Sequence, residues 1–309
     1  MKKEKVSFGG WPNCVRLCNE EIELIVTTDV GPRIIYLGYL KGHNLLYVSP
    51  GDKGKKGGDQ WRIYGGHRLW HAPEEMPRTY FPDNKPIEYS WNGNTLHLIQ
   101  ETESTTGIRK EMQVTLDPDQ NQVTILHQLT NNNLWDIELS AWSITAFAGG
   151  GRAVLPQEPF VDSSLNLLPS RPIVLWHYTQ MEDPRWKWGN KYIQLLQDPS
   201  LQSEQKIGIL NKQGWAAYYL DGHAVIKHFT FDPDASYTDY GCNNEVYVNG
   251  EFLEVESLGP VTHLAPGEYL AHTEQWMIAK LQGPLSDTSE KSIDQFLIPM
   301  VHSFLKVEL

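Results

Sequence analysis

The stretch IRKEMQVTLDPDQNQVTILHQL, residues 108–129, decides the fold class. Its apolar residues fall mostly on alternate positions, at 108, 112, 114 and 116 in the first half and at 123, 125 and 129 in the second. Alternation with a period of two is typical of a strand with one buried face. The residues between the halves, DPDQN, are turn formers. The stretch therefore predicts an antiparallel β-hairpin.

The same alternation continues along most of the chain. It recurs in EIELIVT, residues 21–27, and the dipeptides Asp221-Gly222 and Asn249-Gly250 predict tight turns between further strands. So many strands without intervening helices predict an all-β fold, either a sandwich of sheets or a closed barrel, and periodicity alone leaves both open. Because no repeat or shift in composition divides the chain, we expect one domain over residues 1–309.

Only the end of the chain, residues 286–304, has helical spacing. Apolar side chains at 293, 297, 300 and 304 form one stripe, and Ser286 is the predicted N-cap. Pro299 is expected to kink or end this short helix. The longest predicted loops cover residues 51–60 and 157–172, and loops of such length are often functional.

Charge and cysteine content exclude several classes of function. The chain has 26 Lys and Arg against 38 Asp and Glu, a net charge of -12, which repels nucleic acids and anionic membranes. The sequence contains no run of about 18 apolar residues, the length that would predict a membrane span. The cysteines Cys14, Cys18 and Cys242 are too few for a disulfide framework and favour a reducing compartment. We therefore expect a cytoplasmic protein without nucleic-acid or membrane partners; the sequence leaves the oligomeric state open.

The first candidate site is GGHRLWHAPE, residues 65–74. His67 and His71 are four residues apart, as in zinc peptidases, but the flanking glycines and Ala72-Pro73 favour a loop or a strand end over a helix. The stretch is then a metal site, one wall of a sugar pocket, or a packed turn. The two glycines indicate a close approach of the backbone to something. Four neighbouring side chains add charge and ring planes as candidate substrate contacts: Arg62, Arg68, Trp70 and Glu74.

The second candidate site is the segment EFLEVES, residues 251–257. If it is a strand, Glu254 and Glu256 share one face with Phe252, while the aliphatic residues between them face the other way. Glu245, on the preceding predicted strand, is expected close to the same sheet surface. The carboxylates form either a solvated outer face or the acidic floor of a cleft.

Two further segments mix aromatic planes with polar groups. Trp142, in ELSAWSITAF, is either a core residue or a stacking surface for a sugar ring. Asp183 and Lys187 lie in MEDPRWKWGNKY, which predicts either a solvated loop or a rim that contacts a polyol or an acidic sugar. The P-loop, the dinucleotide fingerprint and the GxSxG elbow are all missing from the sequence.

Three stretches, taken in order, resemble the galactose mutarotase-like superfamily, which includes the aldose 1-epimerases. They are GGHRLWHAPE, HQLTNNNLWDIELSAWSITAFAGGG and GEFLEVESLGPVTHLAPGEYLAHTEQWMI, and the resemblance covers residues 15 to 280. It implies a large antiparallel β-sandwich, a super-sandwich, whose concave sheet holds a sugar. In these enzymes a glutamate takes the proton of the anomeric hydroxyl and a histidine protonates the ring oxygen, without metal or cofactor. The details of the motifs are most similar to an uncharacterised bacterial branch.

Carried over by position, the resemblance implies specific roles. Glu254 matches the base, with Glu256 as a rival, and His67 or His71 matches the first histidine. Arg62 matches the preceding arginine, while the family's substrate-binding aspartate has no clear counterpart and Asp183 is the candidate for it. The strand that should bring the second histidine offers serines and Trp142 in its place.

The resulting hypothesis is a carbohydrate-binding protein that interconverts sugar anomers with a Glu base and a His acid. The alternative from another class is a non-catalytic carbohydrate-recognition module, and a third is a metal-dependent hydrolase or lyase that uses His67, His71 and Glu256. Basic residues near the predicted cleft suggest a phosphorylated or acidic sugar as the ligand.

Overall fold

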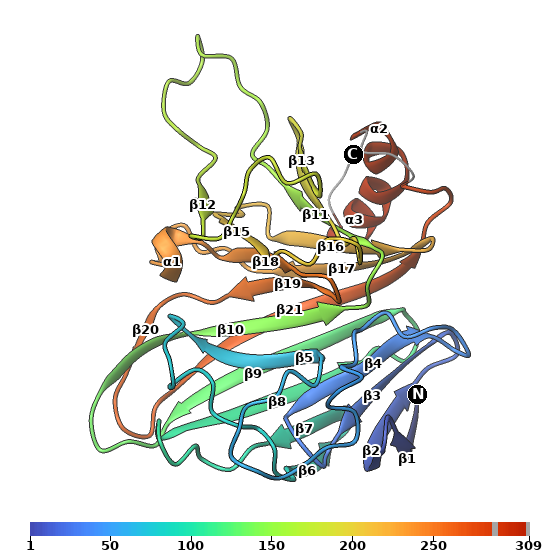
Figure 1. The fold of residues 1–309 in the computed structure, drawn as a ribbon, viewed down its shortest axis with the longest axis vertical. Coiled ribbons are helices and arrows are strands. Elements are labelled where there is room, and N and C mark those ends of the chain that lie inside the picture. The colour runs from blue at the N-terminus through green and yellow to red at the C-terminus, as the bar shows by residue number, and fades with distance from the viewer. Residues whose placement is uncertain (286–289, 307–309) are drawn as a thin grey trace.

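The computed structural model describes residues 1–285 and 290–306 and contains two large antiparallel β-sheets packed face to face (Figure 1). The first sheet has the spatial order β1 (Lys2–Phe8), β2 (Trp11–Cys18), β3 (Ile22–Thr27), β4 (Arg33–Tyr39), β5 (Gly66–Ala72), β10 (Ile137–Phe147), β19 (Leu253–Leu258), β18 (Asn244–Val248), β15 (Gln205–Ile209) and β12 (Ile173–Leu175), with β20 (Thr262–Leu264) beside β10. The second sheet has the order β13 (Trp186–Trp188), β14 (Tyr192–Leu196), β11 (Arg152–Pro156), β16 (Trp215–Leu220), β17 (His223–Phe229), β21 (Tyr269–Lys280), β9 (Gln122–Asn131), β8 (Ile108–Leu116), β7 (Thr95–Ile99) and β6 (Glu88–Asn92). The predicted all-β sandwich is confirmed.

The apolar faces of the alternating strands meet between the two sheets. Leu24 and Val26 of the first sheet belong to the same fully buried cluster as Val114 and Ile125 of the second. Val114 and Ile125 are also directly paired across β8 and β9, so the predicted hairpin and its facing are confirmed. Burial of this continuous apolar layer is the main stabilising contribution to the sandwich.

The two predicted turns have different outcomes. Asp221 and Gly222 connect β16 to β17 with φ values of 47° and 81°, as a two-residue hairpin turn requires. A turn at Asn249-Gly250 does connect β18 to β19, as predicted, but the connection takes four residues and neither Asn249 nor Gly250 has a positive φ. The Asn249 side chain accepts hydrogen bonds from the backbone N–H groups of Glu251 and Phe252, and this wider turn replaces the tight one.

Residues Gly66–Ala72 of the stretch GGHRLWHAPE form strand β5, so of the two predicted alternatives, a loop and a strand end, the strand holds. Gly65 and Gly66 have φ values of 94° and 71°. A Cβ atom on Gly66 would lie 2.1 Å from the carbonyl oxygen of Ile34, and one on Gly65 would lie 2.2 Å from that of Tyr47. The close approach that the two glycines indicate is therefore to the chain's own backbone.

The helical region near the end of the chain comprises α2 (Glu290–Ser292), a π-helical turn η1 (Ile293–Leu297) and α3 (Ile298–Leu305), and a single turn, α1 (Thr238–Gly241), precedes β18. Pro299 does not end the helix, because it lies in the first turn of α3, where its missing N–H is not needed. Ile293 and Leu297 are buried in one cluster with Ile226 of the second sheet. The predicted cap Ser286 lies outside the described residues.

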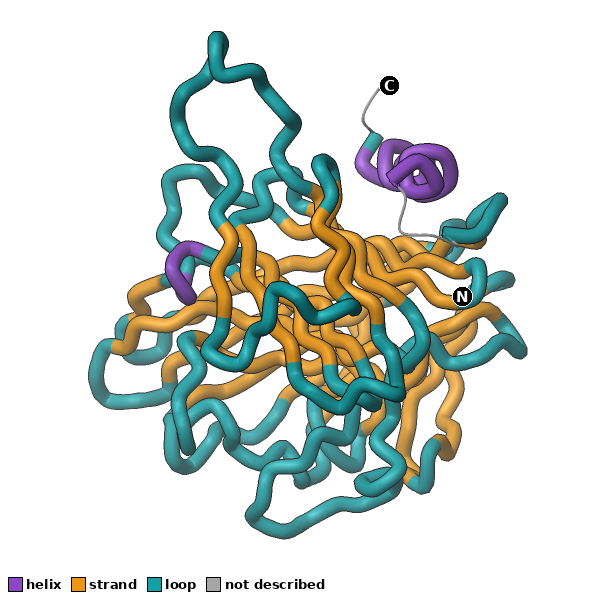
Figure 2. The backbone as a smooth tube through the Cα atoms, turned by 45° about the horizontal axis from the view of Figure 1, so that its top comes forward, coloured by secondary structure: helices purple, strands orange, loops and turns teal. Residues whose placement is uncertain are grey.

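The long segment between β11 and β12, residues 157–172, projects away from the sandwich (Figure 2). Among the helices of the described part of the chain, none is both long and apolar enough to cross a bilayer.

Candidate functional site

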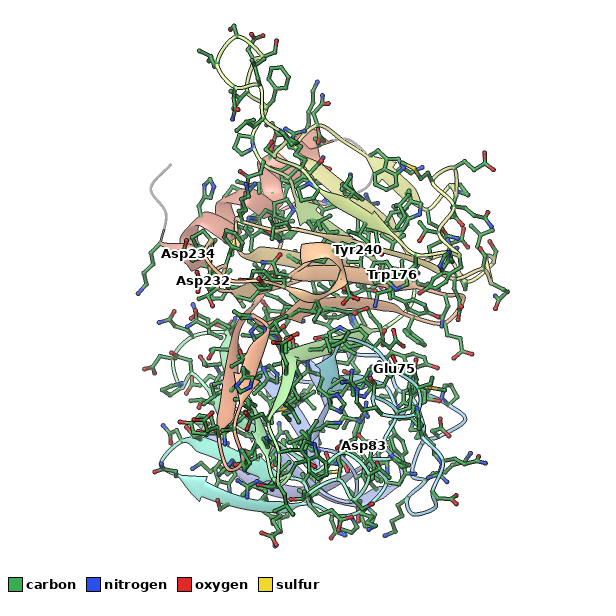
Figure 3. The ribbon with its side chains drawn as sticks, turned by 90° about the vertical axis from the view of Figure 1, so that its left-hand side faces the viewer. Glu75, Asp83, Trp176, Asp232, Asp234 and Tyr240 are labelled. Carbon is green, nitrogen blue, oxygen red and sulfur yellow. The ribbon has the colours of Figure 1, made fainter. Side chains whose placement is uncertain are left out.

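A cavity of about 540 Å³ opens on the outer face of the first sheet, the face turned away from the second sheet. Its floor is formed by five adjacent strands, β5, β10, β19, β18 and β15. The segments that follow β5 and β12, together with the connections that precede β15 and β19, form its edges. Glu75 and Trp176, which belong to the first two of these segments, are visible on the same side of the molecule (Figure 3).

Strand alternation decides which side chains reach the cavity. Arg68 and Trp70 of β5, Trp142 of β10 and Glu254 of β19 line it, while their neighbours, such as Val255, face the core between the sheets. The pairing of Trp70 with Trp142 across β5 and β10 places two indole rings side by side on the floor, with ring centroids 5.5 Å apart.

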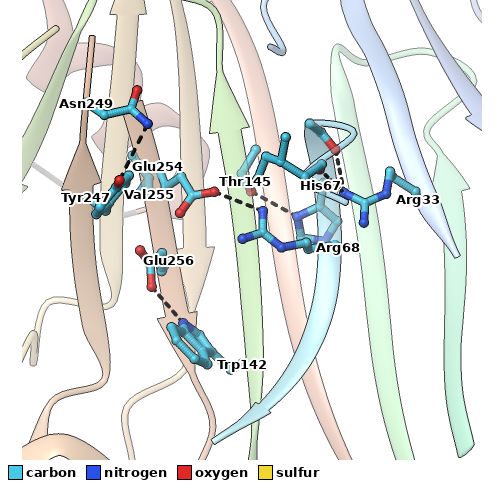
Figure 4. Close-up of polar contacts among 12 residues, drawn as sticks. Arg33, His67, Arg68, Trp142, Thr145, Tyr247, Asn249, Glu254, Val255 and Glu256 are labelled. Atoms are coloured by element: carbon cyan, nitrogen blue, oxygen red, sulfur yellow. Dashed lines mark hydrogen bonds and ion pairs between the residues drawn. The ribbon is translucent and has the colours of Figure 1, made fainter. Parts of the chain in front are cut away.

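Arg68 and Glu254 form a buried ion pair at the floor (Figure 4). The distance from Nη1 to Oε1 is 2.9 Å, and the side chains are 4% and 9% exposed. Burial raises the pKa of the Glu254 carboxyl above its ordinary value, although the Arg68 guanidinium opposes this shift.

Lys206 of β15 forms a second charged group beside the first. Its Nζ lies 2.7 Å from Oε2 of Glu245 and 3.0 Å from Oε2 of Glu256. Burial alone would lower the pKa of Lys206, but the two carboxylates outweigh it and raise the pKa well above the ordinary value. Glu256 also accepts a hydrogen bond from Nε1 of Trp142 at 2.7 Å (Figure 4).

Three carboxylates at the edges of the cavity each accept a hydrogen bond from a tyrosine hydroxyl. The pairs are Tyr80 with Glu74, Tyr247 with Glu204 and Tyr47 with Glu251. Burial, and then the hydrogen bond to the carboxylate, raise the pKa of each of these tyrosines, so that each stays a neutral donor.

The structure does not bring His67 and His71 to the cavity. Both side chains are fully buried on the inner side of β5, because Arg68 and Trp70 occupy the outer side. Nδ1 of His67 lies 2.9 Å from the Thr145 hydroxyl (Figure 4), and its Nε2 lies 2.7 Å from Nε2 of His127. The expected convergence of these imidazoles with Glu254 is therefore absent.

Among the residues that the structure describes, one group of side chains, between the sheets, has ligand atoms close enough to hold a metal ion. His67, His127 and Glu274 offer atoms that all lie within 4.8 Å of one another. Lys227 already supplies the positive charge there, with its Nζ 2.9 Å from Glu274. The metal set predicted from the sequence, His67, His71 and Glu256, is not assembled, because Glu256 lies on the opposite face of the sheet.

Four predicted substrate contacts do not line the cavity, and one of them, Glu245, lies behind Lys206. Arg62 donates a hydrogen bond to the carbonyl of Gly57 at 2.6 Å. Asp183 forms an ion pair with Arg185 at 2.9 Å, and Lys187 lies in β13 of the second sheet. The lining residues that the sequence analysis missed include Lys206, Trp176, Tyr178 and Tyr247. Alternation in QKIGI would have placed Lys206 opposite Ile207, but its carboxylate partners come from strands distant in sequence.

Comparison with solved structures finds the same architecture elsewhere. A galactose mutarotase-like protein from Lactobacillus casei is similar with a TM-score of 0.58 and 10% identity, over 86% of this chain and 100% of that one. A protein provisionally described as an aldose 1-epimerase, from Escherichia coli K12, is similar with a TM-score of 0.57 and 14% identity, over 87% of this chain and 99% of that one.

A TPR-domain containing protein from Parabacteroides distasonis is similar with a TM-score of 0.57 and 17% identity. The match covers 88% of this chain and 48% of that protein, so this chain spans about half of its length. No protein-family model and no curated protein matches the sequence. At such identities the similarities show a shared fold and carry no statement about activity.

Proposed function

We propose that this chain, whose fold is that of the galactose mutarotase-like proteins, binds a carbohydrate in the cavity on the outer face of the first sheet. The observation that carries the proposal is the combination of indole planes with charged hydrogen-bonding groups on one floor, Trp70 and Trp142 beside Arg68 and Glu254. The cavity volume of about 540 Å³ lies within the range of small-molecule sites.

This combination matches the chemistry of a sugar. The C–H face of a pyranose is apolar and packs on an aromatic ring, while its hydroxyl groups need donors and acceptors at the ring edge. The guanidinium of Arg68 is a donor, and the carboxylate of Glu254 is an acceptor at the same depth. A site with both kinds of group orients a sugar ring and discriminates among hydroxyl configurations.

Anomer interconversion is the second candidate function. It is favoured by the position of Glu254 and by its raised pKa, since a carboxylate of higher pKa is a stronger base. The reaction also needs an acid at the ring oxygen. Lys206 and Tyr178 line the cavity, but the pKa of each is raised above its ordinary value, which makes each a weaker acid. Recognition without turnover is therefore the better-supported function.

Calorimetric titration with a panel of aldoses and disaccharides, combined with polarimetry on freshly dissolved sugars, tests both candidates. We expect saturable binding and anomer exchange at the rate of buffer alone. Trp176→Ala should weaken binding at least fivefold, since it removes one aromatic wall. The matched control Trp91→Ala, in β6 of the second sheet, should leave it unchanged. The proposal is wrong if the folded protein binds no saccharide of the panel.

Accelerated anomer exchange that Glu254→Gln abolishes would instead establish the second candidate. A cytoplasmic location, which the three buried free thiols favour, stays a prediction.

A further inference from the structure

The side chains that line the cavity carry more negative than positive charge. The cations are Arg68 and Lys206, and the carboxylates are Glu74, Glu204, Glu251 and Glu254. Arg68 is already paired with Glu254, and Lys206 is paired with two further carboxylates behind it. The cavity therefore offers no unmatched cation to an anionic ligand.

The three carboxylates at the edge have no basic partner. Within the described residues, no Lys, Arg or His nitrogen lies within 4.0 Å of Glu74, Glu204 or Glu251. Each uses one oxygen to accept a tyrosine hydroxyl and leaves the other oxygen available. A cationic group of the ligand would donate hydrogen bonds to the available oxygens of these carboxylates. Such charge-assisted hydrogen bonds are stronger than neutral ones.

The aromatic walls also suit an ammonium group. The two cations that line the cavity both lie over tryptophan rings: Lys206 Nζ is 4.6 Å from the Trp142 centroid and 4.8 Å from that of Trp176, and the Arg68 guanidinium is 4.8 Å from Trp70. On the other side, Trp61 contacts Trp70 and Tyr80, with ring centroids 5.5 Å and 5.3 Å apart. Since Arg68 and Lys206 already cover those faces of Trp70, Trp142 and Trp176, the rings left for a ligand ammonium are Trp61 and Tyr80, beside Glu74.

We infer that the carbohydrate which this cavity selects carries a protonated amino group, and that acidic and phosphorylated sugars are rejected. The inference rests on the proposed carbohydrate binding and narrows its ligand class. The ammonium group lies near the edge glutamates, while the ring stacks on the floor. This ligand class is opposite in charge to the phosphorylated or acidic sugar that the sequence suggests.

The test is calorimetric titration at pH 6 and low salt with matched sugars. Glucosamine, galactosamine and mannosamine are each compared with the parent hexose, with the N-acetyl derivative, which has lost the charge, and with glucose 6-phosphate. We expect each amine that binds to bind roughly tenfold more tightly than its parent hexose, as one favourable cation site allows. Added salt should weaken the binding of the amine and leave that of the hexose unchanged.

The variants Glu204→Gln and Glu251→Gln should reduce the ratio of amine to hexose affinity several-fold, whereas Glu88→Gln on β6 should not change it. Equal affinities for amine and hexose, or tighter binding of glucose 6-phosphate, would overturn the inference and leave the proposed carbohydrate binding intact. Tight binding of choline without binding of any sugar would overturn both, because the cavity would then be a cation site of another class.

Discussion

At the scale of single residues, the floor of the cavity is held by charges that meet from distant parts of the chain. Arg68 and Glu254 are 186 positions apart, and their side chains are 4% and 9% exposed. A buried charge that loses its partner pays most of its desolvation cost without compensation. The ion pair therefore fixes the positions of the two binding groups, Arg68 and Glu254. It also links strands β5 and β19, which are not direct neighbours in the sheet.

Replacing one member of this pair should destabilise the fold. Glu254→Leu leaves the Arg68 guanidinium buried and unpaired, so the free energy of unfolding should fall by about 3 kcal/mol in urea titrations. The double variant Arg68→Met with Glu254→Leu should recover most of this loss. Glu4→Gln, at the exposed pair with Arg16, should cost less than about 1 kcal/mol. A loss in Glu254→Leu no larger than in this control would contradict the prediction.

At the scale of elements, β5 begins where the backbone passes very close to its neighbours. Gly66 has a positive φ and lies against the Ile34 carbonyl of β4, whereas Gly222 has a positive φ in an open turn with no atom near its missing side chain. The two glycines share a backbone requirement and differ in their surroundings.

Alanine at these two positions separates conformational strain from steric clash. Gly222→Ala should lower the free energy of unfolding by about 1–2 kcal/mol, the cost of a left-handed residue with a Cβ. Gly66→Ala should cost considerably more, because its Cβ would lie 2.1 Å from a backbone oxygen that cannot move without breaking the β4–β5 pairing. Similar losses at both positions, measured by urea unfolding, would show that the clash is relieved.

At the scale of the whole molecule, a polar layer runs through the interface between the two sheets. His67 of the first sheet contacts His127 of the second, and the backbone carbonyl of His272 accepts a hydrogen bond from Nδ1 of His127 at 2.9 Å. The Ser257 hydroxyl donates a hydrogen bond to the Glu274 carboxylate at 2.6 Å, and the same carboxylate forms an ion pair with Lys227. The described side chains satisfy one another, so the layer fixes how the sheets face each other.

The neutral histidines of this layer should make stability depend on pH. Burial lowers the pKa of His272 to about 3, and it also lowers the pKa values of His67, His71 and His127. Since these groups stay neutral when folded but protonate near pH 6.5 when unfolded, the unfolded chain binds more protons at acidic pH. Stability should be fully present above pH 6.5 and should fall below it, with His272 alone contributing about 1.4 kcal/mol per pH unit down to about pH 3.

Urea unfolding at pH 7.5 and 5.5 measures this dependence. His272→Asn should reduce the slope by about one proton, while His263→Asn, whose side chain is 63% exposed, should leave it unchanged. A free energy of unfolding that is equal at both pH values would contradict the prediction. Glu103 adds a loss below about pH 4.5: burial alone would raise its pKa, but Lys110 and His71 outweigh it and lower the pKa to about 2.

The β-sandwich and one half of the candidate site could be predicted from the sequence. Alternation in EFLEVES correctly put Phe252, Glu254 and Glu256 on one face, because that rule needs only local information. The same rule separates His67 from Arg68 in GGHRLWHA, but the flanking glycines and proline left a loop and a strand end both open, so the rule was not applied there. Lys206 could not be identified, because its burial and its carboxylate partners exist only once β15 lies beside β18.

The projecting segment between β11 and β12 has a consequence for how the chain tolerates cleavage. Phe160, Leu165 and Leu167 are at least 80% exposed there, which makes this segment an accessible target for proteases that prefer large apolar residues. The halves on either side of such a nick are interleaved, because β10 pairs with β19 in one sheet and β9 pairs with β21 in the other. The nicked protein should therefore elute from a size-exclusion column at the same volume as the intact protein. Its two fragments should separate only in a denaturing detergent.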